Sequence, residues 1–158
     1  MTKYLIPVVA LALATSAFAE DKEITISEGL HLSVPKAAEV TKSKKGEQTT
    51  IQGKDWKVYI WPVEKAKTVE EALAHVNATI KPEFTDYVVA STEEITVAGN
   101  KAKHLKGKGA EADDGDPGSA DVVVFEVGKH VFVACVHGEK DAAAKQRPEM
   151  LNVLKTAK

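Results

Sequence analysis

The sequence predicts an α+β protein built on an antiparallel β-sheet of about six to eight strands, with helices packed on its faces. Two observations lead to this fold class. Short segments rich in β-branched and aromatic residues are separated by turn residues, which is typical of antiparallel strands. Two segments with helical spacing, residues 68–81 and 141–154, supply helices that can cover the sheet.

The start of the chain, residues 1–19, has the three-part pattern of a cleavable secretory signal peptide. Lys3 supplies the positive charge, and residues 5–14 form the apolar run. The small side chains of Ala17 and Ala19 stand third and first before the expected cut, where a signal peptidase accepts little more than a methyl group. We therefore expect cleavage after Ala19.

The remainder, residues 20–158, is predicted to be a single globular domain that is exported, either periplasmic or secreted. The apolar run of the signal is only about half of the roughly 20 residues that a membrane-spanning helix needs, so we expect no stable membrane insertion after cleavage. The only cysteine, Cys135, is far from the cleavage site and has no partner for a disulfide within the chain. The net charge of −2, with mixed signs along the chain, gives no support to nucleic-acid binding.

Alternating apolar and polar residues predict strands in the first half of the chain. Leu30, Leu32 and Val34 fall on one face of a half-buried strand, which Pro35 ends. Further strands are expected at residues 23–27, 48–51, 56–62 and 87–89.

Two helices are expected, one in the middle of the chain and one at its end. Thr68 is a fitting N-cap, Glu71 completes a capping box three residues later, and Pro82 ends the helix. Asp141 is expected to cap the final helical segment, in which Pro148 either causes a kink or begins a second helix. The apolar stripe of this segment consists of Met150, Leu151 and Leu154.

Two hairpins follow from pairs of turn residues. The first is centred on Gly99-Asn100, a favoured two-residue turn. One face of this hairpin is polar, and the other carries Ile95, Val97, Ala102 and His104. The second joins residues 122–127 and 130–137 through Gly128-Lys129, and both of its faces are largely apolar. This second hairpin therefore needs cover on both sides.

The connection from Glu111 to Asp121 is rich in carboxylates, which are ligands for hard cations such as calcium. The spacing is not that of an EF-hand, because Ala110 and Ala112 would occupy the first and third ligand positions counted from Gly115. A solvated loop explains the same composition, since Asp, Gly, Pro and Ser are common in turns. The candidate metal ligands are Asp113, Asp114, Asp116 and Asp121.

Cys135 and His137 face the same way in a strand and suggest a soft-metal site, with His104 or His31 as further ligands. The alternative is a buried, inert thiol and a satisfied histidine at a strand end. A Cys-His nucleophilic pair is disfavoured, because the two residues stand about 7 Å apart at their Cα atoms. The serines form no nucleophile motif. The sequence therefore predicts no catalytic residue, no cofactor-binding residue and no cofactor.

A basic stretch follows the first predicted turn and consists of Lys101, Lys103, Lys106 and Lys108, with His104 among them. Such a stretch suits an acidic partner or lipid head groups. Lysines that protect an edge strand are the alternative interpretation.

Taken in order, these elements resemble the PsbP-like superfamily, which includes the DcrB-like exported bacterial proteins. The resemblance covers about residues 24–156 and rests on the layout of the elements. Its landmarks are Gly29–Pro35, the cap at Thr68, the turn region Val97–Ala102, Gly128-Lys129 and Met150–Leu154. The resemblance implies an α/β/α sandwich around the antiparallel sheet, and accessory or binding roles in place of catalysis. No functional residue of the family is carried over to this chain.

We therefore expect an exported, non-enzymatic binding or accessory protein of the cell envelope. Its partner is expected to be another envelope protein or a small ligand. Two alternatives remain: an extracytoplasmic metal-binding protein that takes calcium or a soft metal, and a hydrolase whose residues converge only in the folded chain.

Overall fold

The structure, a computed structural model, describes residues 20–27, 29–45 and 47–158. The predicted signal peptide, with its cleavage site after Ala19, lies outside the described residues. None of the helices that are described has the length and apolar character needed to cross a membrane.

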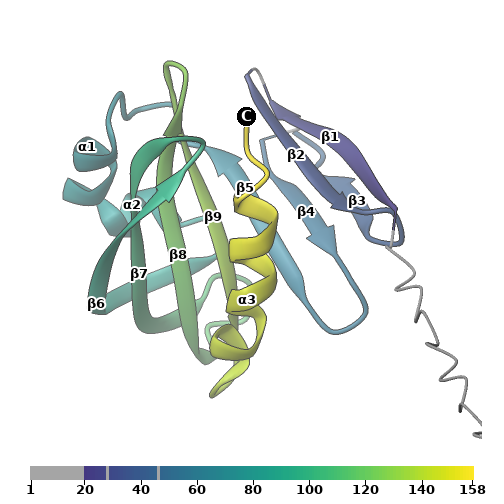
Figure 1. The fold of residues 1–158 in the computed structure, drawn as a ribbon. Coiled ribbons are helices and arrows are strands. Elements are labelled where there is room, and N and C mark those ends of the chain that lie inside the picture. The colour runs from purple at the N-terminus through teal and green to yellow at the C-terminus, as the bar shows by residue number, and fades with distance from the viewer. Residues whose placement is uncertain (1–19, 28, 46) are drawn as a thin grey trace, which may run out of the picture.

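The described residues form nine strands and three helices. In chain order they are β1 (Asp21–Ser27), β2 (Leu30–Pro35), β3 (Glu39–Lys42), β4 (Thr49–Gln52), β5 (Lys57–Pro62), α1 (Val69–Ala74), α2 (Val76–Ile80), β6 (Phe84–Val97), β7 (Asn100–Glu111), β8 (Pro117–Val127), β9 (His130–Gly138) and α3 (Ala142–Leu154). β1 and β2 pair with each other, and the other strands form a 7-stranded antiparallel sheet in the order β3-β4-β5-β9-β8-β7-β6 (Figure 1). The predicted α+β class and the size of the sheet are confirmed.

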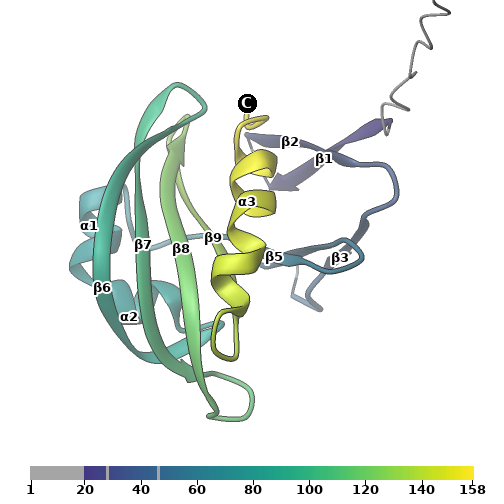
Figure 2. The ribbon, with the colours of Figure 1, turned by 60° about the horizontal axis from the view of Figure 1, so that its bottom comes forward.

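Helices cover both faces of the large sheet, as Figures 1 and 2 show. α1 and α2 pack on one face against β8 and β6, and α3 packs on the other face against β8 and β9. The small β1–β2 sheet lies beside α3 and is tied to the C-terminus by two backbone hydrogen bonds of 3.1 Å between His31 and Lys158. The expected α/β/α sandwich is therefore present.

The β8–β9 hairpin contributes side chains to two separate cores, as its two apolar faces predict. Phe125 and Phe132 stack with their ring centroids 5.7 Å apart in the core beneath α3, together with Met150. Val122 and Cys135 face the opposite core, which α1 and α2 cover. The hairpin is thus the middle layer of the sandwich.

The turn of the first hairpin was predicted one residue too late. Ala98-Gly99 makes the turn in place of Gly99-Asn100, and Val97 pairs with Asn100. Both turn residues have positive φ, 51° and 78°, which a type I′ turn requires. Moving the turn by one residue shifts the pairing by two, so the predicted faces are retained and Ile95 lies opposite Ala102.

The predicted helix over residues 68–81 is broken into α1 and α2 at His75, where φ and ψ are −125° and 43°. The cap is as predicted, since Thr68 Oγ1 accepts a hydrogen bond of 3.1 Å from Glu71 N. The hydroxyl of Thr79 donates to Ala72 O at 2.8 Å across the break. Apolar residues at helical spacing run through both α1 and α2, so local spacing alone did not reveal the break.

Two other segments are more regular than predicted. β8 begins at Pro117, so half of the connection that was expected to be a loop is strand, and Gly109 pairs with Gly118 there. α3 continues through Pro148 as one helix, and Asp141 stands at its N-cap position without a side-chain hydrogen bond. β8 is stabilised along this length by pairing with β7 and β9, and α3 is stabilised by packing on β8 and β9.

We expect Phe132→Ala to lower the free energy of unfolding by about 3–5 kcal/mol, because the ring is fully buried beneath α3 and its loss leaves a cavity. Val88→Ala is the matched control, since Val88 is 71% exposed, and it is expected to change stability by no more than about 0.5 kcal/mol. Urea unfolding followed by circular dichroism measures both. Equal losses in the two variants would contradict this packing.

Candidate functional site

A buried carboxylate lies between α3 and the sheet. Asp121 is 3% exposed on β8, within the face that α3 covers. His104 Nε2 on β7 donates to its Oδ2 at 2.9 Å, which fixes the tautomer that carries a proton on Nε2. Arg147 on α3 donates from Nε to Oδ2 and from Nη2 to Oδ1, the latter at 3.3 Å. We call these three residues the Asp121 cluster.

The Asp121 cluster keeps its carboxylate ionised. Burial alone raises the pKa of Asp121, but the hydrogen bonds from His104 and Arg147, with the charge of Arg147, outweigh it and lower the pKa. The hydrogen bond to Asp121 in turn raises the pKa of Arg147. The other ring nitrogen of His104, Nδ1, lies 3.9 Å from Glu93 Oε2, and Glu93 also pairs with Lys106 at 2.7 Å.

Beside this cluster runs a groove of about 470 Å³ between α3 and the outer strands of the sheet. α3 packs over β8 and β9, and on the same face Ala102 and His104 of β7 are buried, but the part of β6 and β7 around Val88 and Lys108 stays exposed. We call this hollow the helix groove. Its strand wall and its helix wall are lined by Val88, Lys106, Lys108, Lys140, Ala144 and Arg147, and Asp121 also borders it.

The strand wall of the helix groove owes its shape to irregular pairing. β6 carries β-bulges between Thr85 and Val88 and between Val89 and Ser91. A bulge bends the strand and changes the direction in which its side chains point. Gly107 lies opposite this region, where an added Cβ would collide with the carbonyl oxygen of Val88. As a result Val88 is 71% exposed, the one large exposed hydrophobic side chain in the described part of the chain.

A second polar cluster lies on the α1–α2 side of the sheet. His137 on β9 is bonded through Nε2 to Glu83 Oε2 at 2.7 Å, and its Nδ1 lies 3.4 Å from Glu111 Oε1 without hydrogen-bond geometry. Tyr59 stacks on the imidazole with ring centroids 4.9 Å apart, and Gln48 donates to the other oxygen of Glu83. We call His137, Glu83 and Glu111 the His137 cluster.

Charge dominates the His137 cluster. Burial alone lowers the pKa of His137, but the hydrogen bond and charge of Glu83, with the charge of Glu111, outweigh burial and raise the pKa. Burial, followed by the charge of Glu83, raises the pKa of Tyr59 to about 12. The two carboxylates therefore favour the protonated form of the imidazole, which lies beside a neutral phenol.

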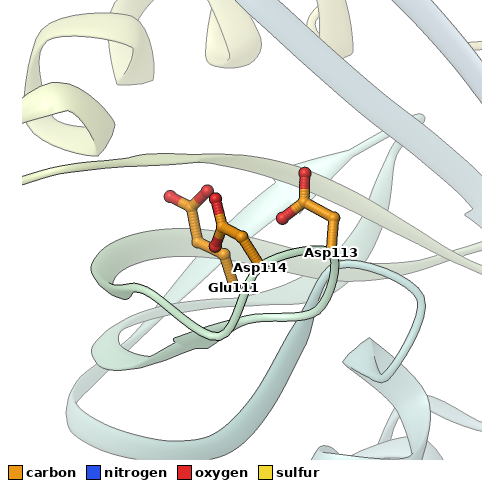
Figure 3. A group of neighbouring side chains, drawn as sticks. All are labelled: Glu111, Asp113 and Asp114. Atoms are coloured by element: carbon orange, nitrogen blue, oxygen red, sulfur yellow. The ribbon is translucent and has the colours of Figure 1, made fainter.

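The predicted metal ligands are divided by the structure. Glu111, Asp113 and Asp114 place carboxylate oxygens within 4.8 Å of one another, and Figure 3 shows their side chains on the same side of the β7–β8 connection. Asp116 is not part of that group, and Asp121 belongs to the buried Asp121 cluster. Metal binding by the acidic connection stays a prediction.

The predicted soft-metal ligands are engaged in separate contacts. Cys135 is buried, and burial raises the pKa of its thiol. His104 is bonded to Asp121, His137 to Glu83, and His31 contacts Thr25 Oγ1 within the small sheet at 3.1 Å. The structure therefore does not bring these histidines together with Cys135 around a common point.

The edge-strand interpretation of the lysines is wrong, because β7 lies between β6 and β8 and the edge is β6. Lys101 and Lys103 pair with Glu94 at 3.4 and 3.0 Å, and Lys106 pairs with Glu93. These pairs join neighbouring strands. The four lysines do not share a face, because Lys101 and Lys103 lie on the α1–α2 side of β7, whereas Lys106 and Lys108 lie with His104 on the α3 side.

Sequence reasoning missed Arg147 and Glu83 as site residues. A signal for Arg147 existed: it precedes the apolar Met150 by three residues and therefore lies near the buried stripe of the helix. No comparable signal marks Glu83, because it meets His137 across 54 positions of the sequence.

Asp121→Asn leaves the guanidinium of Arg147 without its anionic partner. We expect the free energy of unfolding to fall by about 2–4 kcal/mol. This is less than for a fully buried ion pair, because the Arg147 side chain is 30% exposed. The pKa of Asp121 is lowered on folding. The wild-type protein therefore has its full excess in free energy of unfolding over the variant above about pH 4, and this excess declines as the pH falls toward the lowered pKa. Denaturant titrations over acidic pH measure this difference. A stability difference that grew as the pH fell would contradict an ionised Asp121 paired with Arg147.

His137→Gln removes a histidine whose pKa is raised on folding. The stabilisation by the protonated imidazole is complete below about pH 6.5 and is lost as the pH rises through the raised value. We expect the difference in melting temperature between wild type and variant to shrink with increasing pH. His75→Gln, an exposed position, is the control and is expected to show no such trend. A constant difference for His137→Gln would rule out the charged pair.

Comparison with family models and with curated proteins finds no match. Among solved structures, the chain is similar to the solution structure of cyanobacterial PsbP (CyanoP) from Synechocystis sp. PCC 6803, with a TM-score of 0.54 and 12% identity over 91% of this chain and 95% of that chain. It is also similar to a crystal structure from Bacteroides thetaiotaomicron, with a TM-score of 0.55 and 12% identity over 85% of this chain and 47% of that chain. The chain therefore has the PsbP-like fold, as its layout of elements predicts.

Proposed function

We propose that the protein is an exported, non-enzymatic binding or accessory protein of the cell envelope, and that its partner occupies the helix groove. The observation that carries this proposal is the exposed part of β6 and β7 beside α3, where Val88 stands among lysines. The export part of the proposal rests on the signal pattern of residues 1–19.

The composition of the helix groove supports binding. Val88 contributes little to the core and remains in contact with water, whereas the comparable valines of β8 and β9 are buried. An exposed apolar side chain rimmed by polar groups is typical of interaction sites. The wall formed by α3 is held in place by the contact between Arg147 and Asp121, so the groove is formed before a partner arrives.

The chemistry of both clusters supports a role without catalysis. In the Asp121 cluster the carboxylate accepts hydrogen bonds from His104 and Arg147, and in the His137 cluster the imidazole is paired with Glu83. The thiol of Cys135 is buried with a raised pKa, which disfavours the reactive thiolate. The hydrolase alternative requires an accessible nucleophile beside an unpaired base.

A photoreactive amino acid placed at Val88 tests the proposal in cells that produce the full chain. We expect irradiation to yield a discrete adduct, and we expect the same partner when the photoreactive group stands at Ala144 on the opposite wall. The control position is Glu70, which is exposed on α1 at the other face of the sheet. Equal capture from all three positions, or no capture from Val88 and Ala144, would reject the helix groove as the binding site.

A further inference from the structure

We propose that the helix groove binds an acidic peptide segment of the partner, with Arg147 as the anchor for a carboxylate. This inference rests on the proposed function and names the chemistry that the groove recognises. Lys108 and Lys140 stand on opposite walls and supply further positive charge.

The first argument is the charge of the groove. Its lining includes the cations Lys106, Lys108, Lys140 and Arg147, against the carboxylates Asp121 and Asp141, on a chain whose net charge is −2. Asp121 and Arg147 neutralise each other, and Lys106 pairs with Glu93, which leaves Lys108 and Lys140 against the single carboxylate of Asp141. Lys108 and Lys140 have no ion-pair partner in the described part of the chain. A local excess of positive charge on an acidic protein favours an anionic ligand.

The second argument is the geometry of Arg147. Its side-on contact with Asp121 uses Nε and Nη2, and within the described residues Nη1 has no hydrogen-bond partner. The side chain is 30% exposed at the groove. Because Asp121 already holds the guanidinium in place, a ligand carboxylate meets donors that need little further ordering.

The third argument distinguishes a peptide from a small anion. The groove has an apolar part, formed by the exposed side chains of Val88 and Ala90 on one wall and of Ala144 on the other. A small dicarboxylate would leave these side chains in water, whereas a peptide that carries aliphatic and acidic side chains covers them and meets the cations. The volume of about 470 Å³ lies within the range of binding sites that hold several such groups.

The test is selection from a random peptide library on the purified protein, followed by fluorescence anisotropy of the most enriched peptide. We expect enrichment of Asp and Glu beside aliphatic residues. Replacing those acidic residues by Gln and Asn in the peptide is expected to weaken binding about tenfold, as is the protein variant Lys108→Gln/Lys140→Gln. Binding is expected to weaken as ionic strength rises.

Matched variants separate recognition from folding. Lys54→Gln/Lys65→Gln removes the same charge at exposed positions outside the groove and is expected to leave binding unchanged. Arg147→Lys keeps the charge opposite Asp121 but loses the planar fork, so we expect weaker binding with an unchanged far-ultraviolet circular dichroism spectrum.

The outcomes also separate this inference from the proposed function. Enriched peptides without excess carboxylates, or equal binding of the neutral analogue, would overturn anion recognition, while capture from Val88 and Ala144 would still support the groove as a binding site. Glutarate that competed as tightly as the peptide would overturn the peptide in favour of a small carboxylate. If Lys54→Gln/Lys65→Gln weakened peptide binding as much as Lys108→Gln/Lys140→Gln, the net charge of the protein, and not the groove, would account for the binding.

Discussion

The β8–β9 hairpin is apolar on both faces, and the other layers of the fold are arranged to keep water from both. One face carries Phe125 and Phe132 beneath α3, and the opposite face carries Val122 and Cys135 beneath α1 and α2. A sheet of this kind is stable only between two layers. The layers therefore depend on each other, because loss of either would expose a continuous apolar strand surface.

The same requirement explains the polar contacts under α3. Asp121 lies on the apolar face of β8, where an unpaired carboxylate would be strongly destabilising. Arg147 and His104 donate hydrogen bonds to it, and the contact with Arg147 ties α3 to the sheet. The position of α3 is thus set by Met150 and its neighbours in the core and by an ion pair at the margin. That position in turn defines one wall of the helix groove.

The face beneath α3 has two unlike halves. Over β8 and β9 it is covered by α3, and Ala102 and His104 of β7 are buried as well. Around Val88 it is open, because bulges in β6 leave this side chain exposed. The likeness to CyanoP at 12% identity concerns the fold, and folds of this kind do not specify a ligand. A ligand for this chain therefore has to be argued from its own residues and not from the fold.

Local patterns in the sequence were sufficient for most of the strands and their faces, the cap at Thr68 and the turn at Gly128-Lys129, because each depends on near neighbours in the chain. They did not predict β3 or the first residues of β8. The break at His75 is accompanied by long-range contacts of α2, since Trp61 Nε1 donates to Thr79 O and Tyr87 N donates to Asn77 Oδ1, and helical spacing does not encode such contacts. The site was decided only by the tertiary structure. Asp121 was expected in a loop, but in the structure it forms a buried ion pair with Arg147, 26 positions away. Periodicity in the sequence does not encode contacts between charges that are so far apart in the chain.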